Sequence, residues 1–110
     1  MFSPWEITEI ADRIRDMVAE HGAQKVFSDP DLYNALFHAD SRGTSVAHRL
    51  AVAPSGSKGA YDATIKQINA YFARSKRILA LTTEKGRSVA DSMNGAGRQA
   101  AGESLKALRR

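Results

Sequence analysis

Basic and amide side chains recur between residues 58 and 87 at spacings that suit contact with a polyanion. Lysine and arginine neutralise phosphates, and an affinity built on such contacts falls steeply as salt rises. Glutamine and arginine also hydrogen-bond to base edges in a major groove, which are the roles we assign to Gln67 and Arg74. The candidate DNA contacts are Lys58, Lys66, Gln67, Arg74, Lys76, Arg77, Lys85 and Arg87.

Side chains suited to covalent or metal chemistry are few and lie apart. His21, His38 and His48 show no HxxxH or HExxH spacing, and the chain has no cysteine. A zinc site and a thiol nucleophile are therefore not expected. The stretch "SGSKG" at 55–59 lacks the full GxxxxGK[ST] pattern, so we interpret it as a loop whose Lys58 and amides hold a phosphate. We expect no enzyme, no metal and no cofactor.

Charge is divided unevenly along the chain. Residues 1–40 contain three basic and eight acidic side chains, a net charge of −5. Residues 41–110 contain thirteen basic and four acidic side chains, a net charge of +9. The second part is therefore the candidate polyanion binder. The alternative is a basic surface that only keeps the protein in solution.

The length of 110 residues fits one domain with one modest core. No apolar run approaches the roughly 18 residues that a membrane span needs. The first ten residues carry acidic side chains and lack the basic and apolar regions of a secretory signal. We expect a cytoplasmic protein without membrane contact, with a single helical domain over 1–93 and a glycine-containing basic tail over 94–110.

The clearest element is a helix that begins at Pro4. Ser3 and Glu6 form a capping box around its start, and Gly22 ends it. Its apolar residues follow the helical period and are Ile7, Ile10, Ala11, Ile14, Met17 and Val18. This stripe covers either the chain's own core or a second copy of the protein. Together with the apolar spacing of the C-terminal segment, it predicts a homodimer.

Three further helices follow. Asp29 opens the second, which ends before Gly43, and Thr44 caps the third, "SVAHRLAV". After the connector "APSGSKG", the fourth runs from about 60 to 76 and buries Tyr61, Ile65, Ile68 and Phe72. Its opposite side combines small and long polar residues that suit a major groove, namely Ala63, Lys66, Gln67, Ala70, Arg74 and Arg77.

Two interpretations compete for the segment after the fourth helix. In both, "RILALT" is a short strand. The chain then either turns at Lys85-Gly86 and returns as a second strand, or enters a helix from about Glu84 to Met93 capped by Thr82 or Thr83. We favour the helix, because the residues at 91–94 are poor strand formers. We detect no internal repeat.

Taken together, "SVAHRLAV", the connector, "AYDATIKQINAYFARSK" and "RILALTTEKGRSVAD" resemble a winged helix-turn-helix regulator of the MarR type, over about half the chain. In this resemblance "AHRLAV" is the first helix of the pair, 60–76 is the recognition helix and "LTTEKGR" is the exit from the wing. The resemblance implies a dimeric regulator of transcription. The connector is longer than the usual turn, and little room for a wing separates Phe72 from Leu81.

We therefore expect a mainly α domain of about five helices, with a short β wing if the resemblance holds. The predicted function is DNA binding through a basic recognition helix at 60–77, in a dimeric transcription regulator. The alternative is a small helical protein-interaction module that does not bind nucleic acid. Such a module would be an adaptor, an antagonist of a regulator or a phage-type inhibitor. Its basic surface would then contact an acidic protein partner.

Overall fold

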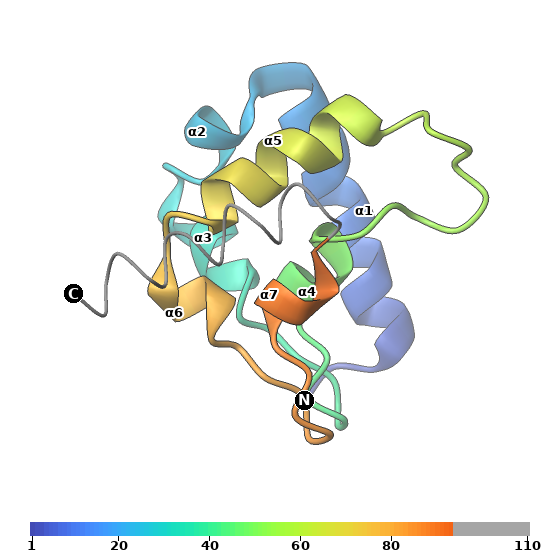
Figure 1. The fold of residues 1–110 in the computed structure, drawn as a ribbon, viewed down its shortest axis with the longest axis vertical. Coiled ribbons are helices and arrows are strands. Elements are labelled where there is room, and N and C mark those ends of the chain that lie inside the picture. Colours follow the sequence, from blue (N-terminus) through green and yellow to red (C-terminus); the bar gives the residue numbers. More distant parts are fainter. Residues whose placement is uncertain (94–110) are drawn as a thin grey trace.

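The computed structural model describes residues 1–93 and is mainly helical over this range, as expected (Figure 1). These residues form no sheet, only isolated bridges, so a β wing is not confirmed. None of their helices is long and apolar enough to span a membrane. The predicted tail, 94–110, lies outside the described residues. The helices are α1 (Pro4–His21), α2 (Ala23–Val26), α3 (Pro30–Ala35), α4 (Val46–Leu50), α5 (Asp62–Phe72), α6 (Lys76–Leu79) and α7 (Val89–Ser92).

Helix α1 has the predicted ends. The Ser3 hydroxyl accepts from the Glu6 N–H at 3.1 Å, the Glu6 carboxylate accepts from the Ser3 N–H at 3.0 Å, and Gly22 ends the helix at a φ of +89°. The apolar stripe of α1 is buried in the chain's own core, mainly through Ile7, Ala11, Ile14 and Val18. The other two members of the stripe, Ile10 and Met17, are partly buried and pack against the same core.

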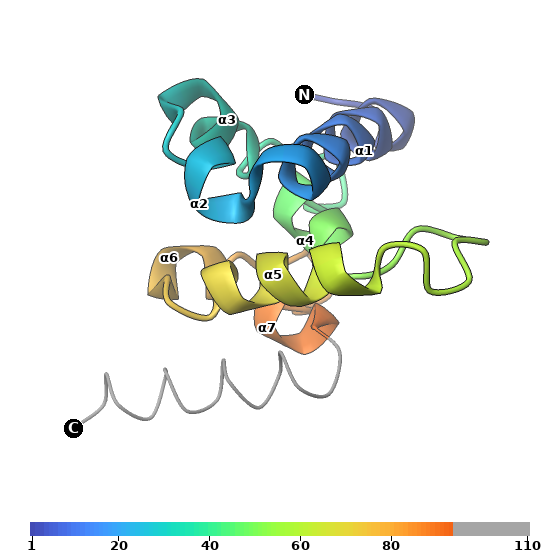
Figure 2. The same ribbon diagram turned by 90° about the horizontal axis from the view of Figure 1, so that it is seen from above.

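The helices are stacked in layers. Figure 2 shows α1 and α3 on one side, α5, α6 and α7 on the other, and α4 between them. Helix α4 packs against α1 and α7, and its Val46, Ala47 and Leu50 are fully buried. The outer layers come from different parts of the sequence, since α1 and α3 lie within residues 1–40 and α5, α6 and α7 lie within residues 41–93.

Several predicted helix bounds change in the structure. Helix α2 was not predicted, because it starts directly after Gly22 and is too short to show a period. The third helix is capped by Ser45 and not by Thr44. The fourth is interrupted after Phe72, where the Ser75 hydroxyl accepts from the Ile78 N–H and starts α6. The predicted strand "RILALT" is wrong, since Ile78 and Leu79 are helical and buried, and only Thr82 takes part in an isolated bridge.

The favoured helix from Glu84 to Met93 is also wrong in its start. Residues 83–87 form a turn, closed by the Thr83 N–H donating to the Arg87 carbonyl at 2.9 Å. The cap of α7 is Ser88, whose hydroxyl accepts from the Asp91 N–H. The hairpin alternative is formed only as a single bridge between Thr82 and Ser88. Gly86, at a φ of +84°, makes the turn possible because this backbone region disfavours side chains.

One structural unit occurs twice in the chain, which corrects our expectation of no internal repeat. A short helix, a glycine turn and a serine-capped helix follow each other as α3–turn–α4 and again as α6–turn–α7. Equivalent residues are 43 positions apart, as Gly43 and Gly86 are. In the first unit the Asp40 N–H donates to the Thr44 carbonyl, and in the second the Thr83 N–H donates to the Arg87 carbonyl. Both units also have a capping box at their serine.

The two turns, residues 40–44 and 83–87, pack against each other, and we call them the twin turns. The Glu84 N–H donates to the Arg42 carbonyl at 3.0 Å and so joins them. Both lie at the lower end of the molecule in Figure 1. A backbone contact between the turns requires a residue without a side chain at Gly43, whose φ is +79°.

Candidate nucleic-acid interface

Helix α5 has the orientation that the sequence predicts. Ile65, Ile68 and Phe72 are at most 2% exposed and face the core. The opposite side is open to solvent within the described structure. We call it the α5 flank, and it consists of Ala63, Lys66, Gln67, Ala70 and Arg74. Small alanines between long polar residues therefore lie on the surface, as the DNA prediction requires.

A groove of about 560 Å³ runs between α2 and α5, beside this flank. Two cations line it, Lys25 from α2 and Arg74 from just after α5, together with His21. No residue that lines it is acidic. Lys25 was missed from the sequence because α2 has no period that would assign it to a face. The groove widens the basic surface of α5 toward the end of α1.

Gln67 has a partner inside the protein. Its side-chain carbonyl accepts a hydrogen bond from the Ala23 N–H at the start of α2. Gly22 ends α1 just before this point, so the first amides of α2 need an acceptor. Gln67 thus fixes α2 against α5, and its amide NH₂ remains for a base edge. Its predicted role in base reading stays a prediction.

Arg77 and Lys76 lie on α6, beyond the break after α5. The Arg77 guanidinium stacks on the Phe37 ring at 4.2 Å from its centroid, which orients the side chain but leaves it exposed. Because Ser75 starts a new helix, this pair does not continue the α5 flank. The basic cluster expected at Arg74, Lys76 and Arg77 is therefore divided between two elements.

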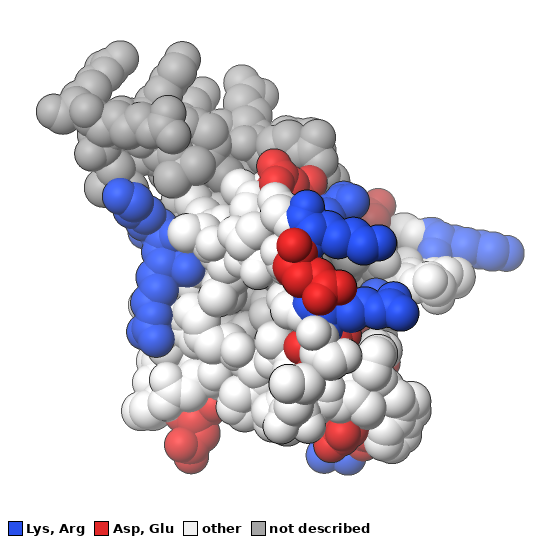
Figure 3. Space-filling model, turned by 90° about the horizontal axis from the view of Figure 1, so that it is seen from below, with Lys and Arg blue, Asp and Glu red and all other residues white. Residues whose placement is uncertain are grey.

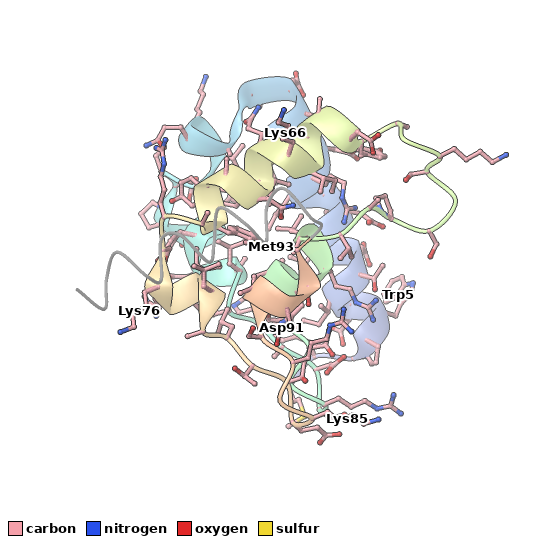
Figure 4. All side chains as sticks on the ribbon, viewed as in Figure 1. Trp5, Lys66, Lys76, Lys85, Asp91 and Met93 are labelled. Atoms are coloured by element: carbon pink, nitrogen blue, oxygen red, sulfur yellow. The ribbon has the colours of Figure 1, made fainter. Side chains whose placement is uncertain are left out.

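The predicted contacts do not form one surface. In Figure 4, Lys66 lies at the upper end of the molecule, Lys85 at the lower end and Lys76 at the lower left. Figure 3 shows the basic side chains of one face in separate groups, with acidic side chains beside one of them. Lys58 is exposed in the connector, and Arg87 lies with Lys85 in the second twin turn. Lys66 and Gln67 on α5 come together with Arg74, which lies just after its end.

The arrangement of α4 and α5 differs from a tight helix-turn-helix pair. The connector, 51–61, separates them, and α5 packs mainly against α1, α2 and α6. Because the connector is longer than a tight turn, α5 does not pack directly after α4 as the second helix of such a pair does. DNA contact by α5 would therefore use its own flank and the neighbouring α2.

Ser45 and His48 are close enough to suggest a nucleophile with its base, but their geometry is structural. The hydroxyl lies 2.7 Å from the His48 Nδ1, in a capping box at the start of α4. Both residues are nearly fully buried, at 2% and 4% exposure, and so no substrate reaches the hydroxyl. Within residues 1–93, no three His, Cys, Asp or Glu side chains are grouped to hold a metal ion.

The His48 ring joins the two structural units. Its Nε2 donates to the Arg87 carbonyl at 3.0 Å, which leaves Nδ1 to accept from the Ser45 N–H at 3.2 Å. This is the neutral tautomer. Burial lowers the pKa of His48 below 6.5, and the charges of Arg87 and Arg49 lower it further, while the hydrogen bond to Arg87 and the charge of Asp40 oppose them.

Stability should consequently depend on pH in the acidic range. Above pH 6.5 both the folded and the unfolded chain hold His48 neutral. As pH falls below 6.5, His48 takes up a proton in the unfolded chain before it does so in the folded chain. Protonation therefore favours the unfolded chain, and the free energy of unfolding decreases as pH falls toward the lowered native pKa. Urea unfolding between about pH 7.5 and about pH 5 measures the loss. His48→Gln should flatten this part of the profile, and an unchanged profile would contradict the assignment.

Comparison of the chain with protein-family models, with curated proteins and with solved structures gave no match.

Proposed function

We propose that this protein binds duplex DNA through the α5 flank and the groove between α2 and α5. The observation that carries the proposal is the exposed combination of Ala63, Ala70, Lys66 and Arg74 on one side of a helix, next to a groove without acidic lining. Small residues let the helix backbone approach the DNA, while the cations reach past them. A B-DNA major groove, about 12 Å wide, admits one helix.

The division of labour follows from the side chains. Lys66, Arg74 and Lys25 neutralise phosphates and supply affinity that depends on salt. The guanidinium of Arg74 is also suited to a bidentate contact with guanine. The proposed phosphate contacts supply most of the affinity, and selectivity among DNA sequences depends on the proposed base contact of Arg74.

A role in transcription and a homodimer are finer parts of the same proposal. A dimer would match a palindromic DNA site. Because most of the apolar stripe of α1 is buried in the core, we propose that the dimer uses another surface. The C-terminal segment predicted to contribute lies outside the described residues. Solution mass at roughly tens of micromolar tests this part, since a monomer removes the two-fold argument.

The test of DNA binding uses a short random-sequence duplex and fluorescence anisotropy at about 50 and about 200 mM salt. The double variant Lys66→Ala/Arg74→Ala should bind about tenfold more weakly at the lower salt, and its salt slope should fall by about 2. Arg13→Ala is the control, because Arg13 is an exposed cation of α1 that is paired with Glu9. It should leave both quantities unchanged.

Two outcomes would contradict the proposal. If the double variant binds like the parent chain while the parent binds DNA, α5 is not the contact. If the parent chain fails to bind at either salt, the alternative of a protein-interaction module with an acidic partner is favoured. The separation of the cations on the surface and Trp5, which is 72% exposed on α1, are the observations that favour this alternative.

A further inference from the structure

A second concave surface lies where the two structural units meet. It is a depression of about 220 Å³ between α4, the twin turns and α7, and we call it the junction pocket. Residues from both units line it, namely Thr44, His48, Arg49, Val52, Thr83, Arg87 and Ser92. It is distinct from the groove between α2 and α5, with which it shares no residue.

The lining has the composition of an anion site. The residues that line it include two arginines, Arg49 and Arg87, and three residues that carry a hydroxyl group, and none of them is acidic. Neither arginine is in an ion pair within the described part of the chain. Both arginines line the same depression as the buried His48 ring. Two unpaired cations around one depression repel each other and favour a bound anion.

The backbone that carries these arginines is held in place. The Arg87 carbonyl accepts from the His48 Nε2 at 3.0 Å, and the Arg87 N–H donates to the Thr83 hydroxyl at 3.2 Å. On α4, the Arg49 carbonyl accepts from the buried Arg15 guanidinium at 3.2 Å. Fixed backbone positions reduce the ordering cost of binding, because only the side chains must become ordered.

The repeat explains how the pocket arises. Thr44 and Arg87 are equivalent positions of the two units, and so are Arg49 and Ser92. Each unit thus contributes one arginine and hydroxyl groups to the same depression. Neither unit alone has both arginines, so the site exists only because the twin turns pack together.

We propose that the junction pocket binds a phosphate group, with the guanidinium groups of Arg49 and Arg87 on its oxygens and the hydroxyls of Thr44 and Thr83 as further donors. Guanidinium groups match phosphate geometry because they present parallel N–H donors. The phosphate belongs either to a free phosphorylated compound or to the backbone of a nucleic acid. The proposal does not depend on DNA contact by α5, because Lys66 lies at the opposite end of the molecule from the twin turns (Figure 4).

The experiment is a titration of the full chain with inorganic phosphate at constant ionic strength, with sodium chloride as the comparison. The histidine ring signals in NMR spectra are the readout. Phosphate should give a saturable shift at His48 and raise its pKa, because a nearby negative charge stabilises the imidazolium. Chloride should do neither. Since His21 and His38 do not line the pocket, their signals serve as internal controls.

Matched variants identify the residues. Arg49→Gln and Arg87→Gln should each weaken phosphate binding about tenfold or more, through loss of charge-assisted hydrogen bonds. Arg42→Gln and Lys85→Gln remove the same charge from the twin turns outside the pocket lining and should change binding at most twofold or so. Equal losses in all four variants would show general screening and overturn the proposal. So would the absence of a saturable shift in the parent chain, whose fold needs no substitution for this test.

A final comparison separates the two sources of phosphate and the two proposals. If a duplex without terminal phosphates displaces inorganic phosphate, and Arg49→Gln weakens DNA binding, the pocket takes a backbone phosphate. If DNA neither displaces phosphate nor responds to Arg49→Gln, the pocket takes a free phosphate compound. The Lys66→Ala/Arg74→Ala variant should bind inorganic phosphate normally, so failure of the α5 proposal leaves this one intact.

Discussion

Gly43→Ala is expected to lower the free energy of unfolding by about 3 kcal/mol, and Gly86→Ala by only about 1 kcal/mol. The two glycines are equivalent positions of the repeat, and both have a positive φ, +79° and +84°. Their backbone strain after substitution is therefore nearly the same. The difference between the two losses of unfolding free energy therefore measures the contact between the two turns.

That contact is made by backbone atoms. A Cβ at Gly43 would lie 3.1 Å from both the Glu84 nitrogen and the Thr83 Cα, whereas a Cβ at Gly86 would meet nothing within 4 Å. A backbone neighbour cannot rotate away as a side chain does, so the turns would separate. Their separation would weaken the hydrogen bond between the Glu84 N–H and the Arg42 carbonyl.

Urea unfolding of the two variants and the parent chain measures this effect. Equal losses for Gly43→Ala and Gly86→Ala would mean that the turns do not pack as described. The junction pocket would then lose its basis as well, because it needs both turns. As the control, Gly86→Ala should bind phosphate like the parent chain, because this substitution leaves the contact between the turns intact.

Ser45→Ala is expected to cost about 2–3 kcal/mol of unfolding free energy, against about 1 kcal/mol for Ser88→Ala. Both serines are helix caps with a capping box, at equivalent positions of the repeat. Ser88 caps a half-buried helix start through the Asp91 N–H at 3.1 Å. Its removal is the ordinary loss of a cap.

Ser45 has more to lose because it is buried and bonded to His48. Its hydroxyl accepts from the His48 N–H at 3.2 Å and lies 2.7 Å from the ring Nδ1. Without it, a buried ring nitrogen keeps only the weaker contact with the Ser45 N–H, and the bond from Nε2 to Arg87 is less well oriented. Urea unfolding at neutral pH gives the comparison. A smaller cost for Ser45→Ala than for Ser88→Ala would contradict the proposed link between the units.

Short-range signals in the sequence were reliable guides to structure here. The capping box at Ser3, the end of α1 at Gly22 and the Asp29 cap of α3 depend on residues within four positions of each other, and all three predictions are confirmed. The buried stripe of α5 is confirmed for Ile65, Ile68 and Phe72 for the same reason, since the helical period relates neighbours on one helix, whereas Tyr61 before the helix is only half-buried. The caps Ser45 and Ser88 carry equally local signals, but we placed them at Thr44 and at Thr82 or Thr83, because these threonines gave competing signals. The cap Ser75 was missed because the fourth helix was predicted to continue through it.

The candidate sites also differ in whether local signals in the sequence can predict them. Residue types and spacing identified Lys66 and Arg74 on an exposed helical face, because exposure on α5 follows from its own period. The groove with Lys25 depends on α2 lying against α5, and the junction pocket depends on Arg49 meeting Arg87 across the core. No local rule brings such residues together.

By itself, then, the sequence determined a mainly helical chain, its first helix, the charge difference between its two parts and the exposed cations of α5. Only the tertiary structure decided that α1 uses its apolar stripe inside the chain, that the cations fall into separate groups and that two similar turns meet. The physical reason is the separation along the chain over which each kind of interaction acts. Caps and periods act between near neighbours, whereas the twin turns join backbone groups that are far apart in the chain and become adjacent only when the core has formed.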